Sequence, residues 1–103
     1  MSSHEFDRQK WALLSIFEQM GNIGSEVGRA MNAMARGDEP SMQGAYWRGL
    51  DLIDATVSAA TPARKRELLR AREEFSRVIE SGHPDAGLED YFMEYAIAAR
   101  LNR

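Results

Sequence analysis

The sequence predicts an all-α protein, an up-and-down four-helix bundle with a long first helix. Three observations predict this fold. Apolar residues recur at steps of three and four in four segments of the chain. Glycine and proline stand between these segments, where helices end and begin. Valine, isoleucine and threonine nowhere alternate with polar residues, as they do in strands. Short loops make successive helices antiparallel neighbours, which is the bundle arrangement.

The first helix is predicted from about Asp7 to Met34. Its apolar stripe is sustained for three heptads and consists of Leu13, Ile16, Phe17, Met20, Ile23, Val27, Ala30, Met31 and Met34. Gly37, which suits the end of a helix, and Pro40 mark where it stops. At about 1.5 Å per residue this helix is roughly 40 Å long. It is longer than the other three helices, so the part that extends beyond them must be either exposed to solvent or covered by a partner.

The other three helices are shorter. The second begins with Ser41 as its N-cap, and Thr61 ends it and caps the third, with proline at the first helical position. The third closes in the segment 81–84, and the fourth is predicted from about Leu88 to Leu101. The residues expected to face inward are Tyr46, Leu50, Ile53, Val57 and Ala60, then Leu68, Ala71, Phe75, Val78 and Ile79, then Leu88, Tyr91, Phe92, Tyr95, Ala98 and Ala99.

Length and composition predict one domain, residues 1–103, of ordinary globular character. Hydrophobic residues make up 44% and charged residues 28% of the chain, a balance that allows a core to form. The net charge of -3 disfavours a general affinity for nucleic acid. The sequence has no cysteine, no apolar run of the roughly 18 residues that span a bilayer, and no signal-peptide layout at its start. We therefore expect a cytoplasmic protein without a membrane segment.

Three glycines lie inside the predicted first helix. Gly21, Gly24 and Gly28 are spaced three and four apart, so they share one edge of the apolar stripe and form a shallow groove. Each costs about 1 kcal/mol relative to alanine in a helix. The favoured explanation is that another helix of the chain crosses closely there. The alternatives are a ligand or partner chain against the exposed backbone, or a local kink.

Trp11 and a group of polar residues lie on the other side of the same predicted helix, opposite the apolar stripe. Tryptophan and arginine are enriched where protein surfaces meet. The alternative is a peripheral cluster within a monomer. With the glycines included, the candidate interaction residues are Trp11, Glu18, Gly21, Asn22, Gly24, Ser25, Glu26, Gly28 and Arg29. Their expected partner is a second copy of the chain in a homodimer, and a second protein is the other candidate.

The sequence predicts no catalytic residue, no metal site and no cofactor. The only histidines are His4 and His83, and neither follows a glutamate by three residues, as the metal ligands of di-metal bundles do. No serine lies in a strand–turn–helix elbow, and no glycine-rich phosphate loop is present. The acidic residues, Glu26 among them, fall mainly on polar faces, where we expect them to be solvated. An enzyme is therefore the less favoured class.

A basic segment on the third helix supports a second hypothesis. It consists of Arg64, Lys65, Arg66, Arg70 and Arg77, followed by His83. Such a patch suits RNA, a nucleotide or an acidic partner, although glutamates are interleaved and Glu73 is placed to pair with Arg77. The spacing of Arg77 and His83 resembles the Arg-then-His motif of HEPN ribonuclease domains, which are also helical bundles. That resemblance covers these two residues alone, and His83 follows the helix instead of belonging to it.

Longer motifs resemble a family of small, uncharacterised prokaryotic all-helical proteins. They are Trp11-x-x-Leu14-Ser15-x-x-Glu18-Gln19-x-Gly21-Asn22-Ile23-Gly24-Ser25-Glu26-Val27-x-Arg29-Ala30 and Tyr91-Phe92-x-x-Tyr95-Ala96-x-Ala98-Ala99-Arg100. The likeness extends over most of the chain, and it implies a helical fold without a reaction or ligand. We therefore expect a homo-oligomeric structural or protein-interaction module. The alternative is an RNA-processing or nucleotide-binding bundle, HEPN-like, that uses the basic third helix.

Overall fold

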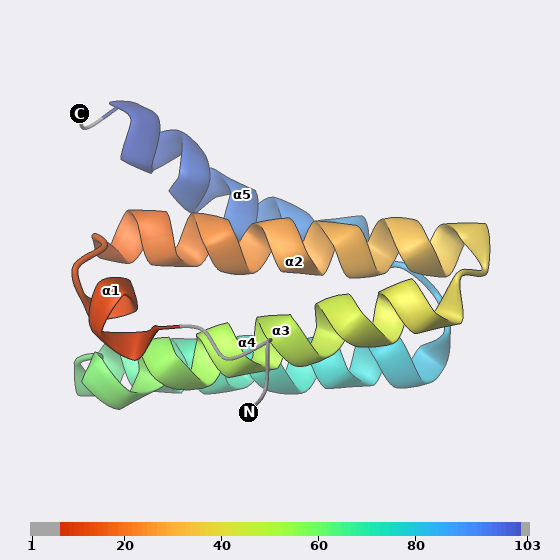
Figure 1. Ribbon diagram of the computed structural model, residues 1–103, viewed down its shortest axis with the longest axis horizontal. Helices are drawn as coiled ribbons and strands as arrows, with labels where there is room; N and C mark the ends of the chain where they lie inside the picture. The colour runs from red at the N-terminus through yellow and green to blue at the C-terminus, as the bar shows by residue number, and fades with distance from the viewer. Residues whose placement is uncertain (1–6, 102–103) are drawn as a thin grey trace.

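The described part of the chain consists of five α-helices and contains no strand. The computed structural model (Figure 1) describes residues 7–101, with all side chains except those of residues 86, 96 and 98–100. The helices are α1 (Arg8–Ala12), α2 (Ile16–Arg36), α3 (Glu39–Ala59), α4 (Pro62–Ser81) and α5 (Ala86–Leu101). The prediction of an all-α fold is confirmed. His4 and the side chains of Ala98 and Ala99, named above, lie outside the described residues.

The prediction of one long first helix is wrong, because the chain breaks between α1 and α2. Ser15 caps the start of α2. Its hydroxyl accepts a hydrogen bond from the Glu18 amide at 3.1 Å, and the Glu18 carboxylate accepts one from the Ser15 amide at 3.1 Å. This reciprocal pair is a capping box, which fixes a helix start. Leu13, placed in the apolar stripe above, lies in the break and is 85% exposed.

Helix α1 packs across α3, and Trp11 holds it there. The Trp11 side chain is buried, and its indole nitrogen donates a hydrogen bond to the Thr56 hydroxyl at 3.0 Å. The side-chain amide of Gln19 donates another hydrogen bond to the backbone carbonyl of Trp11 at 2.9 Å. Because the break before α2 reorients α1, Trp11 joins the core. The expectation that Trp11 lies on the polar face of a continuous helix is therefore wrong.

The other helix boundaries follow turn and cap chemistry. Gly37 and Gly82 end α2 and α4 in the left-handed conformation, with φ of 72° and 74°. Thr61 caps α4, as predicted. Helix α3 begins earlier than predicted, because Asp38 is its N-cap in place of Ser41. The Asp38 carboxylate accepts a hydrogen bond from the Ser41 amide at 3.2 Å, and hydrogen bonding to Ser41 lowers the pKa of Asp38.

Helix α2 is the centre of the fold. It packs extensively against both α3 and α5, α4 packs on α3, and α4 and α5 scarcely touch. Figure 1 shows the chain reversing direction at each connection from α2 to α5, and the C-terminal part of α5 tilting away from the other helices. The fully buried core side chains include Met20, Ile23, Val27, Ile53, Leu68, Phe75 and Phe92. The packing thus departs from a closed bundle, because it is open between α4 and α5.

Two glycines of α2 lie where α5 crosses it. A Cβ atom added to Gly24 would lie 2.7 Å from the Cβ atom of Phe92, and one added to Gly28 would lie 3.0 Å from the carboxylate of Glu89. Only glycine therefore permits this approach of α5 at position 24 without a shift of the helices. Of the alternatives that the sequence leaves open, close packing within the chain is the one observed at both glycines.

Candidate functional site

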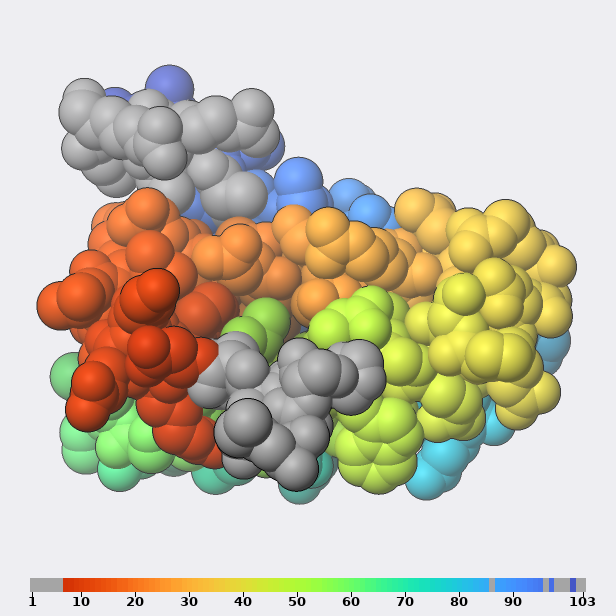
Figure 2. Space-filling view, in the orientation of Figure 1, coloured from red at the N-terminus to blue at the C-terminus, as the bar shows by residue number. Residues whose placement is uncertain are grey.

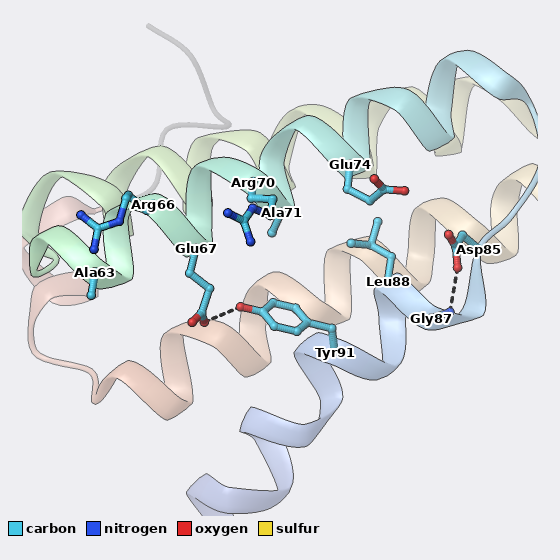
Figure 3. Close-up of a pocket in the computed structure, with 10 residues that line it drawn as sticks. All are labelled: Ala63, Arg66, Glu67, Arg70, Ala71, Glu74, Asp85, Gly87, Leu88 and Tyr91. Carbon is cyan, nitrogen blue, oxygen red and sulfur yellow. Dashed lines mark hydrogen bonds between the residues drawn. The ribbon is translucent and has the colours of Figure 1, made fainter.

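A groove of about 650 Å³ lies between α4 and α5, where the two helices diverge (Figure 3). Its lower wall, from α5 and the loop before it, carries Leu88 and Tyr91 with Asp85 at one end, and its upper wall, from α4, carries most of the charged side chains. Leu88 and Ala71 are buried beneath it. The lining residues are Ala63, Arg66, Glu67, Arg70, Ala71 and Glu74 of α4 with Asp85, Gly87, Leu88 and Tyr91.

Glu67 provides the polar link between α4 and α5. Its Oε1 accepts hydrogen bonds from the hydroxyls of Tyr91 and Tyr95, the latter at 2.7 Å, and from the Arg64 guanidinium at 3.3 Å. The bond from Tyr91, followed by that from Tyr95, lowers the pKa of Glu67. Burial raises the pKa of Tyr91, and its bond to Glu67 adds to that shift. At neutral pH the cluster is therefore an ionised Glu67 carboxylate that accepts hydrogen bonds from two tyrosine hydroxyls.

Two arginines of the groove have no acidic partner within residues 7–101. These are Arg66 and Arg70, which form no ion pair there. The carboxylates that line the groove all accept a hydrogen bond or ion pair already, namely Glu67, Glu74 and Asp85. Asp85 accepts only a neutral backbone amide and so keeps its charge near the loop, whereas Arg66 and Arg70 bring unpaired positive charge to the part of the groove beside Tyr91. This combination suits an occupant that is acidic and partly apolar.

Two basic residues of α4, Arg64 and Arg77, contact other side chains of the same chain. Arg64 donates a hydrogen bond to the Tyr95 hydroxyl at 2.8 Å, and its guanidinium carbon lies 5.4 Å from the centroid of that ring. Arg77 pairs with Glu74, in place of the Glu73 partner expected from the spacing. Both arginines thus have acidic or aromatic neighbours on their own chain.

The remaining basic candidates lie on two surfaces. Arg66 and Arg70 line the groove, whereas Lys65 is exposed outside it. His83 lies exposed in the loop that follows Gly82. The RNA-processing hypothesis depends on these residues acting together. It stays a prediction, and their arrangement does not favour it.

The candidate interaction residues of α2 divide between two sides of the helix. Gly24 and Gly28 lie against α5, and Glu18 caps the start of α2. The half-buried Gly21 lies one turn before Gly24. A separate hollow of about 450 Å³ between α1, α2 and α3 is lined by five of the predicted residues, namely Trp11, Asn22, Ser25, Glu26 and Arg29. The predicted grouping of these polar residues beside Trp11 is therefore present.

Glu26 is buried, contrary to the expectation that it is solvated. Its side chain is 11% exposed, and its Oε2 accepts a hydrogen bond from Arg48 Nε at 3.0 Å. Its Oε1 lies 3.2 Å from Arg29 Nη1, an ion pair without hydrogen-bond geometry. A buried carboxylate needs such partners, because its own desolvation is costly. Sequence reasoning missed Arg48, since no local pattern connects this residue of α3 with α2.

Comparisons with known proteins find no match for this chain among family models, curated proteins or solved structures. The resemblance to a prokaryotic helical family therefore stays a prediction, as do the cytoplasmic location and the homodimer. Within residues 7–101, no three histidine or acidic side chains gather as ligands for a metal ion. In the same range, none of the helices combines the length and apolar character needed to cross a membrane.

Proposed function

We propose that this protein is a self-associating interaction module whose groove between α4 and α5 binds α5 of a second copy. The observation that carries the proposal is the pair Arg66 and Arg70, which line the groove without an acidic partner in residues 7–101. A fitting occupant is helical, acidic along one part and apolar along another. Helix α5 itself has this character.

Four residues on the outer face of α5 form what we call the α5 stripe: Asp90, Glu94, Ile97 and Leu101. Their spacing of four, three and four residues places them on one face of the helix. All four are exposed, Ile97 by 51% and Leu101 by 79%. Neither acid forms an ion pair within residues 7–101. The α5 stripe therefore offers carboxylates and apolar surface that its own chain leaves unused.

The charges of the groove and of the α5 stripe match in spacing. Arg66 and Arg70 are four residues apart, as are Asp90 and Glu94, so each pair spans about 6 Å along its helix. An antiparallel approach to α4 also places the apolar end of the stripe over the exposed Ala63. A parallel approach would place that end against the glutamates in the middle of α4. The charges and the apolar surface together favour the antiparallel arrangement.

Each copy carries both the groove and the α5 stripe, so two copies related by a two-fold axis make the same contact twice. A helix laid into an apolar groove is a recurrent mode of recognition. In this proposal α5 of the second copy fills the open side between α4 and α5. The four-helix packing predicted from the sequence is then completed by the dimer.

Sedimentation equilibrium over a range of protein concentrations tests the proposal. The wild type is expected to dimerise, and more weakly at high salt, because exposed charge pairs are screened. Arg70→Glu is expected to weaken the dimer about tenfold or more, since it places like charges together. Lys65→Glu is the matched control. It makes the same charge change on an exposed residue of α4 outside the groove and leaves the dimer unchanged.

A mixing experiment identifies the surfaces in contact. Arg66→Glu/Arg70→Glu and Asp90→Lys/Glu94→Lys are each expected to be monomeric alone. Mixed in equal amounts, they are expected to form a heterodimer, because one contact then keeps its natural charges and the other has both signs reversed. A wild type that stays monomeric at every concentration, or variants that fail to associate on mixing, would contradict the proposal.

A further inference from the structure

A hollow of about 390 Å³ lies on a different surface, where the C-terminal half of α2 meets the N-terminal half of α3. Figure 2 shows the face of the molecule on which these two helices lie side by side. The lining residues are Arg29, Asn32 and Arg36 of α2 with Pro40, Ser41, Gly44 and Arg48 of α3. We call this feature the three-arginine hollow. It shares no residue with the groove between α4 and α5.

The wall of the three-arginine hollow is rich in hydrogen-bond donors. Every charged residue that lines it is an arginine. Asn32 adds a side-chain amide, which has no hydrogen-bond partner within residues 7–101, and Ser41 adds a hydroxyl. The three arginine side chains are 63%, 59% and 50% exposed, so solvent and ligands can reach them. Such a wall attracts an anion.

Two carboxylates hold the arginines without lining the hollow. The buried Glu26 binds Arg29 and Arg48 from between the helices, and Asp38 binds Arg36 at 3.4 Å. Three guanidinium groups against two carboxylates leave one positive charge in excess. A guanidinium carries five N–H donors, and each of these carboxylate contacts engages one nitrogen. Most donors therefore stay free while the arginines are already held near one another.

Gly44 allows Arg48 to lie close along α3. A Cβ atom at this position would lie 3.2 Å from Nη1 of Arg48. The guanidinium therefore rests over backbone where other residues carry a side chain. Glu26 binds the Arg48 guanidinium, and Gly44 leaves space for it against α3. Because Arg48 is already held in place, binding a ligand costs less conformational entropy.

We propose that the three-arginine hollow binds the phosphate groups of a small phosphorylated molecule. Guanidinium groups bind phosphate oxygens through paired N–H donors, and a multiply charged oxyanion gains most from three of them. The hollow falls within the size range of small-molecule pockets, about 300–1,000 Å³. The chemistry recognised is a phosphate or pyrophosphate, either free or carried by a nucleotide.

Isothermal titration calorimetry of the full chain with inorganic pyrophosphate at low salt tests the proposal. Arg36→Ala is expected to weaken binding about tenfold or more, since Arg36 lines the hollow and, within residues 7–101, forms an ion pair with Asp38 alone. Gly44→Glu is expected to abolish binding, because its carboxylate would occupy the hollow. This variant is also expected to melt no lower than the wild type, since a good helix former replaces glycine. Arg77→Ala, which removes an exposed arginine that lines neither the hollow nor the groove, is the matched control and should bind like the wild type.

The pyrophosphate titrations can contradict the proposal in three ways. A wild type that does not bind pyrophosphate, or variants at Arg36 and Gly44 that bind it as before, would overturn the proposal. An equal loss in Arg77→Ala would also overturn it, because binding would then depend on overall charge. A nucleoside diphosphate is the second probe. If it binds more tightly than pyrophosphate, the site takes a nucleotide, and if it binds equally, the site takes the free anion.

Discussion

Helix α5 is held differently on its two sides. Toward α2 it is fixed by close apolar packing, with Phe92 fully buried and no room for a methyl group on Gly24. Toward α4 it is joined through the hydrogen bonds of Glu67 with Tyr91 and Tyr95, beside a groove of about 650 Å³. The difference shows that the position of α5 depends on α2. The side toward α4 is the one on which we propose that a second copy binds.

The tight side is tested by Gly24→Ala. The added Cβ atom would lie 2.7 Å from the Cβ atom of Phe92, so the helices must shift, and we expect a loss of about 1–3 kcal/mol in the free energy of unfolding. Urea unfolding followed by circular dichroism measures it. Gly44→Ala is the control, because there only the end of the Arg48 side chain lies near and alanine is expected to stabilise α3 by up to about 1 kcal/mol. Equal stabilisation by both variants would refute the close contact of α2 with α5.

The polar side is tested by Glu67→Gln. The amide oxygen can still accept hydrogen bonds but lacks the charge that strengthens them, and the side chain is 42% exposed, so we expect a loss of about 1 kcal/mol at pH 7. Urea unfolding again provides the measurement. Glu73→Gln, at an exposed position without an ion pair in residues 7–101, should change little. A loss as large as that of Gly24→Ala would remove the contrast between the two sides.

The pH dependence of the same pair of proteins provides a second readout. Hydrogen bonds from the tyrosines lower the pKa of Glu67 in the folded protein. Its contribution to stability is therefore complete above the unfolded pKa, about 4.3, and is lost as the pH falls through the folded pKa. The difference between wild type and Glu67→Gln should be constant from pH 7 to about pH 5 and should shrink below that. A difference that persists unchanged into strong acid would show that the charge of Glu67 does not matter.

The smallest effect is expected for Leu13→Ala. Leu13 continues the apolar pattern of α2 in the sequence but is 85% exposed in the break before that helix. Its truncation should change the free energy of unfolding by no more than about 0.5 kcal/mol in thermal or urea unfolding. A loss above about 2 kcal/mol would mean that Leu13 packs in a core, as a continuous first helix requires.

The helices could be predicted where caps and apolar periodicity point to the same boundaries. This is the case at Thr61 and Gly82, which begin and end α4. The two signals compete before α2. There the periodicity continues through Leu13, while Ser15 and Glu18 form a capping box. The local hydrogen bonds decide the outcome, because they fix the first turn of α2, and the apolar pattern alone could not reveal this.

The sequence could predict some residues of the candidate site but not the groove that brings them together. Arg66 and Arg70 stand out in the sequence as part of a basic segment, but the groove exists because α5 diverges from α4. The contact of Phe92 with Gly24, which joins distant parts of the chain, fixes α5 against α2. The burial of Glu26 likewise depends on Arg48, 22 residues away. Contacts of this kind leave no periodic trace in a single sequence.

The docking of α1 onto α3 gives the protein two indole chromophores in opposite surroundings. Trp11 is 9% exposed and bonded through its ring nitrogen to Thr56, whereas Trp47 is 59% exposed. A shielded indole emits at shorter wavelength and resists quenching by iodide. An exposed indole emits at longer wavelength and is quenched. Detachment of α1 can therefore be followed in unlabelled protein as a red shift of Trp11 emission. The fluorescence lost to iodide before that event belongs to Trp47 on α3.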